Sequence, residues 1–180
     1  SSYRAFTHSF TKCLEAENKL KEQKDPRRTA ALGAILTILS TVHIQLDKVK
    51  IAAQRLIDII LDAKQDAMLI KCIMYRVSVG VIGKGAQQTT AKPEFAFAYA
   101  AVALLTYQGV IQNASGNKLA QAFGRVLMGA YYDICPYTVP LYPIKPDGMD
   151  EEDFKMKHLK YKKNETILKY KKRMAGTIAV

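Results

Sequence analysis

The chain has 180 residues, of which 49% are hydrophobic and 24% are charged. A chain of this length and composition can bury a substantial core, which excludes disorder throughout. Its 27 Lys and Arg residues outnumber the 16 Asp and Glu residues, giving a formal net charge of +11. This excess favours an anionic partner such as RNA, a polyphosphate, a membrane surface or an acidic protein face.

The three cysteines and the apolar stretches exclude further classes. Cys13, Cys72 and Cys135 are odd in number and widely spaced, which argues against a disulfide framework, and none lies in a CxxC or CxxH pair that would hold zinc. No signal peptide is visible, and the longest apolar stretch, Phe95 to Leu105, is too short to cross a membrane. We therefore expect no membrane insertion and a cytosolic or nuclear protein.

Apolar residues recur at helical spacing from the first residues onward. The first three expected helices cover residues 3–24, 26–45 and 47–63. In the first of them, a narrow apolar stripe includes one carboxylate, Glu17. Asp25 followed by Pro26 is a typical start for the second, because Asp caps the free N–H groups and Pro suits the first helical position.

Glycines are expected to end the next two helices. The fourth runs over residues 65–82 and stops at Gly83 and Gly85, and the fifth runs over residues 93–108 and stops at Gly109. The stretch from Phe95 to Leu105 is apolar on nearly every side, so this helix should be central in the fold. A sixth helix is expected over residues 118–133.

The last quarter of the chain changes character. Three prolines within residues 135–143 predict an extended connector, rich in Pro and Tyr, over residues 135–149. Asp150 should cap a helix over residues 151–160, and Asn164 should cap a last helix that looks cut off where the chain stops. Antiparallel helices with short loops predict one all-α domain over residues 1–180, a bundle or a solenoid.

Catalytic and metal-binding patterns are weak. The three histidines are scattered in the sequence and are best interpreted as structural: His8, His43 and His158. Asp58, Asp62 and Asp66 are spaced for one helix face, where a solvated surface is a better interpretation than a metal site. The stretch from Gly80 to Gly85 lacks the GxxxxGK[ST] spacing of a phosphate loop. The chain is therefore not expected to be an enzyme.

The C-terminal basic segment, residues 155–173, supplies +8 of the net charge through nine cations against the single acid Glu165. Its cations are Lys155, Lys157, Lys160, Lys162, Lys163, Lys169, Lys171, Lys172 and Arg173. Phe154, Tyr161 and Tyr170 are interleaved with them. Such a segment is either a phosphate-binding and base-stacking surface or a solvated helical face whose aromatic residues belong to the core.

One series of motifs resembles a known family. Cys135-Pro136-Tyr137-x-Val139-Pro140-x-Tyr142-Pro143 is followed by Gly148-Met149, Glu152-Asp153-Phe154, Tyr161 and Arg173-Met174-Ala175-Gly176. In this order and spacing, the motifs resemble the C-terminal helical domain of the Gle-type nuclear-pore mRNA-export factor, most closely its animal members. Lys92-Pro93-Glu94-Phe95-Ala96-Phe97 and the helix after it resemble the preceding segment of that family.

The resemblance implies an all-helical fold of HEAT and MIF4G type, an antiparallel helical array whose C-terminal part would be missing here. It implies a non-enzymatic factor that binds and stimulates a DEAD-box RNA helicase at the cytoplasmic face of the nuclear pore complex. It also implies a nucleoporin partner and roles with translation initiation and termination factors. The alternative is a basic helical module that binds RNA directly through residues 155–173.

The resemblance also raises the question of a polyanion. Fungal members bind inositol hexakisphosphate (IP6) through a basic pair just before the Cys-Pro-Tyr element and an Arg one turn earlier, where this chain has Asp133, Ile134 and Ala130. Each lost charge-assisted contact costs about 1.5–3 kcal/mol. We therefore expect no required cofactor. The cations that remain as candidates for a weaker site are Lys71, Arg76 and Lys84.

Overall fold

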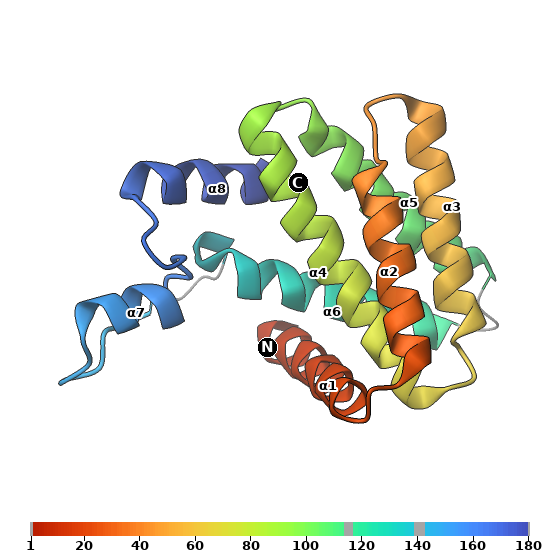
Figure 1. Ribbon diagram of the computed structural model, residues 1–180, viewed down its shortest axis with the longest axis horizontal. Helices are drawn as coiled ribbons and strands as arrows, with labels where there is room; N and C mark the ends of the chain where they lie inside the picture. Colours follow the sequence, from red (N-terminus) through yellow and green to blue (C-terminus); the bar gives the residue numbers. More distant parts are fainter. Residues whose placement is uncertain (1, 114–116, 139–142, 180) are drawn as a thin grey trace.

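The computed structural model describes residues 2–113, 117–138 and 143–179 (Figure 1). Its described part contains α-helices and one short 3₁₀ helix, η1. The bounds are α1 (Ser2–Glu22), α2 (Pro26–Ser40), α3 (Leu46–Asp62), α4 (Ala67–Ala91), α5 (Phe95–Asn113), α6 (Asn117–Ile134), η1 (Pro136–Thr138), α7 (Glu151–Lys157) and α8 (Ile167–Ala179). The all-α fold class predicted from the sequence is confirmed.

Helix α4 is the central element of the fold. It packs against α1, α2, α5, α6 and α8, and its residues Ile73, Val77 and Val81 are fully buried. Figure 1 shows α1 crossing one end of the array, α2 and α3 on one side of α4, and α8 on the other side. Helix α7 lies apart from this core, beside the turn that leads to α8.

Two of the expected helix caps are present. The Asp25 carboxylate accepts a hydrogen bond of 2.8 Å from the backbone N–H of Arg27, and Pro26 opens α2. The Asp150 carboxylate accepts one of 2.8 Å from the N–H of Glu152 at the start of α7. Both aspartates satisfy N–H groups that a helix leaves free in its first turn.

The cap expected at Asn164 was wrong. Asn164 has a left-handed backbone with φ of 58°, which belongs to a turn. Helix α8 begins at Ile167, and Thr166 Oγ1 accepts the N–H of Lys169 at 3.4 Å in the place of the expected cap. Asn adopts the left-handed region more readily than most residues, and this use of Asn competed with capping.

The helix ends expected at glycines were also wrong. Helix α4 continues through Gly83 and Gly85 to Ala91, and α5 continues through Gly109 to Asn113. A glycine inside a helix costs about 1 kcal/mol, which packing can outweigh. A side chain at position 109 would run into Ile57 of α3, so this glycine permits close helix packing.

Helix α5 is not the central helix that its composition predicted. One face is buried through Tyr99, Val102 and Thr106, but Phe97 is 80% exposed and Leu104 is 54% exposed. The whole helix, longer than the predicted 95–105 stretch, has a mean hydropathy of 1.4 and could cross a membrane by length and composition. The same properties suit a core helix with one uncovered side.

Two predicted helices end earlier in the structure, because their last predicted residues belong to loops. Helix α2 ends at Ser40 rather than near Gln45, and α7 ends at Lys157 rather than Lys160. The row of aspartates expected on one helix face is broken. Helix α3 ends at Asp62, and Asp66 lies beyond it, capping α4 with a 2.9 Å bond from the N–H of Leu69.

Candidate functional site

The three cations predicted as a polyanion site do not come together. Lys71, Arg76 and Lys84 all lie on α4, and a rise of about 1.5 Å per residue separates Lys71 from Lys84 by about 20 Å. Lys71 is exposed and Lys84 is half-buried. The Arg76 guanidinium is already engaged inside the molecule.

Arg76 belongs to a buried cluster around Glu17 of α1. Glu17 is 1% exposed, and its Oε1 accepts hydrogen bonds from Arg76 of α4 and from Arg28 of α2. The Cys72 thiol donates to Oε2 at 2.7 Å. Burial alone raises the pKa of Glu17, but hydrogen bonds from Arg76, Arg28 and Cys72 together outweigh it and lower the pKa to about 2.

This cluster joins three helices through one carboxylate, and the sequence reasoning did not identify it. The available signal was the position of Glu17 within the apolar stripe of α1. A carboxylate at such a position is stable only when cations meet it. Arg76 is therefore committed to Glu17, and the structure does not bring it to a shared site with Lys71 and Lys84.

The positions just before Cys135 have two kinds of environment, the main core and the surface. Ala130 is fully buried in the main core, and Ile134 packs against that core. Asp133 is exposed and pairs with Lys160 at 2.9 Å. It lines a pocket of about 360 Å³ between α1, α6 and the end of α7, which Lys157 and His158 also line. The carboxylate neutralises part of the charge that a polyanion would need.

The C-terminal basic segment divides into paired and exposed cations. Lys155 and Lys157 pair with acids of α7 at 3.7 Å and 3.5 Å, Lys160 pairs with Asp133, and Arg173 pairs with Glu165 at 2.6 Å. The remaining members are exposed, and within the described part of the chain none forms a salt bridge. These exposed lysines are Lys162, Lys163, Lys169, Lys171 and Lys172.

The aromatic residues of this segment are structural. Phe154 and Tyr170 are buried. The Tyr161 ring stacks on Tyr170 with centroids 3.7 Å apart and planes 10° apart, and the Tyr170 hydroxyl donates to the Leu159 carbonyl at 2.8 Å. The face of Tyr161 toward Tyr170 is therefore covered and closed to a stacking base.

The family motif forms a second small core. Cys135, Tyr170 and Met174 are buried together, with Tyr161 packed against them. Arg173 donates from Nη2 to the Lys160 carbonyl at 2.7 Å, which fixes the turn before α8. Pro136 and Tyr137 lie in η1, where the Tyr137 ring centroid is 6.1 Å from that of Tyr170, and Pro143 lies beyond η1. Val139, Pro140 and Tyr142 lie outside the described residues.

Gly176 of the motif holds α8 against α4. A Cβ atom at this position would lie 2.7 Å from the backbone oxygen of Ala86. Only a residue without a side chain permits the two helix backbones to approach so closely. Sequence reasoning placed Gly176 in the motif, and its contact with α4 could not be read from the sequence.

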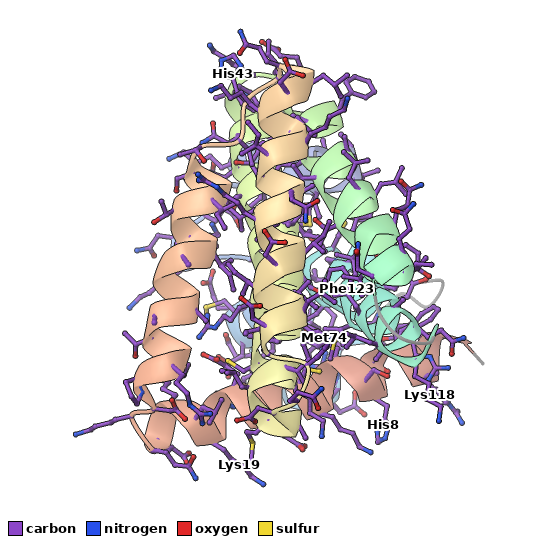
Figure 2. All side chains as sticks on the ribbon, turned by 90° about the vertical axis from the view of Figure 1, so that its right-hand side faces the viewer. His8, Lys19, His43, Met74, Lys118 and Phe123 are labelled. Atoms are coloured by element: carbon purple, nitrogen blue, oxygen red, sulfur yellow. The ribbon has the colours of Figure 1, made fainter. Side chains whose placement is uncertain are left out.

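Within the described residues, the groups usual in catalysis are dispersed. Figure 2 shows His8 and His43 near opposite ends of the molecule, and the described acids, histidines and cysteines form no cluster of three that could hold a metal ion. Burial raises the pKa of the Cys13 thiol to about 11 and that of Cys72 to about 12, which leaves both thiols protonated and weakly nucleophilic at neutral pH.

Comparison with known proteins assigns the chain to a family. The profile of the GLE1-like protein family matches residues 5–180. The chain belongs to the GLE1-like protein family. The resemblance identified from the motif around Cys135 is therefore confirmed, and the GLE1-like match also covers the N-terminal helices. No curated protein matches the chain.

Solved structures place this GLE1-like chain in the same fold as a yeast protein. Two S. cerevisiae structures, each of the Dbp5 C-terminal domain bound to Gle1 and IP6, match with TM-scores of 0.68 and 0.67 at 15% identity. Both matches cover 99% of this chain and 61% of the solved chain. The GLE1-like chain thus spans about three fifths of the length of its structural neighbours.

Proposed function

We propose that this GLE1-like chain is a non-catalytic helical scaffold that binds a DEAD-box RNA helicase and stimulates its ATPase during mRNA export at the cytoplasmic face of the nuclear pore complex. The observation that carries the proposal is the family match over residues 5–180, together with a fold shared with Gle1 chains solved on the helicase Dbp5. A nucleoporin and translation factors are further partners that the family resemblance implies.

The mechanism follows from binding alone. A scaffold that binds one arrangement of the two helicase lobes better than another shifts the helicase toward that arrangement. The dispersed histidines and the protonated thiols support a role without covalent chemistry. No step of this mechanism is assigned to IP6, because Arg76 is paired with Glu17 and Asp133 lies where the resemblance gives fungal members a cation.

The exposed lysines of α8 are our candidates for the helicase contact. Lys169, Lys171 and Lys172 lie on the exposed face of one helix and carry charge that no acid within the described residues neutralises. Such a face attracts an acidic protein surface and accelerates encounter. Direct RNA binding remains the second candidate function, because the same lysines also suit phosphates.

The test measures binding and ATP hydrolysis by the cognate helicase with RNA, with and without this chain, and each with and without IP6. We expect binding, several-fold stimulation, and no further effect of IP6. Replacing Lys169, Lys171 and Lys172 by Gln should weaken binding roughly tenfold.

The matched control replaces Lys12, Lys19 and Lys21 of α1 by Gln, which changes the net charge equally on exposed positions of another helix. This variant should bind as the parent chain does. A chain that neither binds nor stimulates the helicase would contradict the proposed function, and equal losses in both variants would exclude α8 as the contact.

A further inference from the structure

An apolar row on α5 is only partly covered by the rest of the fold. Phe97, Ala100, Leu104, Tyr107 and Ile111 follow one another at intervals of three and four residues, which is the a/d spacing of a helix–helix seam. Phe97 and Leu104 are largely exposed, and Ile111 is 39% exposed. A helix normally presents such a row to another helix, and here α6 packs on Tyr107 while Phe97, Leu104 and Ile111 stay exposed.

Helix α6 provides a second wall beside this row. Gln121, Arg125 and Met128 are spaced by four and three residues along it, and with α5 they line a groove of about 540 Å³. Phe6 of α1 also lines this groove. The groove is therefore bounded by two helical rows and can hold a third helix between them.

Several of the residues that line the groove are small. Ala100 and Ala103 of α5 and Gly124 of α6 leave space between the larger side chains of Leu104 and Met128. A Cβ at position 124 would lie 2.9 Å from Cε2 of Tyr107, so this ring rests directly on the α6 backbone. Large apolar side chains of an incoming helix can enter the space beside these small residues, as knobs enter holes.

The charge beside the groove is positive. Helix α5 contains no charged residue, and the one acid of α6, Asp133, is paired with Lys160. Arg125 lines the groove and Lys118 is exposed on the same helix; neither forms a salt bridge within the described part of the chain. Figure 2 shows Lys118 at the outer edge of the molecule.

We propose that the groove between α5 and α6 binds an amphipathic helix of a partner protein, with apolar residues in the groove and carboxylates facing Arg125 and Lys118. A concave groove with two helical walls suits a helix better than a flat membrane surface, which favours protruding apolar side chains. This inference concerns a surface apart from α8 and does not depend on the proposed helicase contact.

The test uses two synthetic peptides of about three heptads each, with Leu at a and d positions and either Glu or Lys at the flanking positions. Fluorescence anisotropy with the whole chain should detect micromolar binding of the Glu peptide. Leu104→Asp should lower its affinity at least tenfold, because a carboxylate would be placed against the apolar seam. Arg125→Glu should weaken the Glu peptide and strengthen the Lys peptide.

The matched control is Leu46→Asp on α3, another exposed leucine, which should leave binding unchanged. Thermal unfolding of each variant verifies that it is folded. Absence of binding, or binding that Leu104→Asp does not change, would overturn the proposal.

Two further measurements test other occupants. Sedimentation of the chain with phosphatidylcholine–phosphatidylserine vesicles in a ratio of roughly 3:1 tests a membrane. Analytical ultracentrifugation without peptide tests a second copy of the chain. We expect neither interaction to depend on Leu104, and loss of either one in Leu104→Asp would overturn the proposal in favour of that occupant.

Discussion

At the scale of single residues, Glu17 is the buried charge on which the packing of three helices depends. Its carboxylate is the meeting point of α1, α2 and α4, because Arg28 and Arg76 both donate to it. Removing one partner of a buried ion pair leaves the other charges desolvated and unpaired. The charge of Arg76 made it a candidate for a polyanion site. Its actual partner, Glu17, is distant in the sequence, and the sequence alone does not show that pairing.

We predict that Glu17→Gln lowers the free energy of unfolding by roughly 3 kcal/mol at pH 7, the low end for a broken buried pair. Urea unfolding followed by circular dichroism measures this change. Glu15→Gln, an exposed position on the same helix, is the control and should change stability little. Equal effects of the two substitutions would show that the cluster does not hold the helices together.

The same cluster predicts a pH dependence. The pKa of Glu17 falls from an ordinary 4.5 to about 2 on folding, so its contribution is complete above pH 4.5 and is lost as the pH falls toward 2. This contribution is about 3 kcal/mol by linkage. Glu17→Gln should show a correspondingly smaller loss of stability between pH 5 and pH 3, measured by thermal unfolding.

At the scale of helices, the sequence predicted which helices exist better than it predicted the residues at which they end. Every predicted helix is present in the structure, and Asp25 and Asp150 cap their helices because a cap is a local contact. Gly83 and Gly109 gave the wrong ends because both lie inside packed helices, where tertiary contacts outweigh local propensity. Helices distant in the sequence also decide which face of α5 is covered. Composition alone wrongly predicted a central helix covered on nearly every side.

The contact between α4 and α8 gives a prediction at this scale. Gly176→Ala places a Cβ against the backbone oxygen of Ala86, and rigid backbone cannot yield as a side chain can. We expect α8 to move away from α4, with a loss of about 1–3 kcal/mol. Hydrogen exchange should become faster in the amides of α8 and remain unchanged in α2.

Gly33→Ala is the matched control for this substitution. A Cβ at position 33 of α2 meets nothing within 4 Å, so the change should stabilise the chain by up to about 1 kcal/mol through helix propensity. If Gly176→Ala were equally stabilising, the close approach of α8 to α4 would be excluded.

At the scale of the whole molecule, the excess of positive charge has two possible roles that experiment can separate. The paired cations of the C-terminal basic segment stabilise turns and helix ends, whereas Lys169, Lys171 and Lys172 remain open. The buried aromatic residues Phe154 and Tyr170 offer no stacking surface for bases. RNA affinity should therefore come from net charge, and helicase affinity from the arrangement of charge on α8.

We predict that RNA binding by the chain is weak and steeply dependent on salt, and that it falls equally in the two triple Lys→Gln variants of α8 and α1. Electrostatic binding without stacking depends on how many phosphates are neutralised, with a slope of about 0.7 per contact on single strands. Fluorescence anisotropy on a single-stranded RNA at several salt concentrations measures the RNA affinity and its salt dependence.

Helicase binding should instead fall in the α8 variant alone. A selective loss of RNA affinity in the α8 variant, with helicase binding unchanged in both, would reverse the two roles and make residues 155–173 an RNA-binding module.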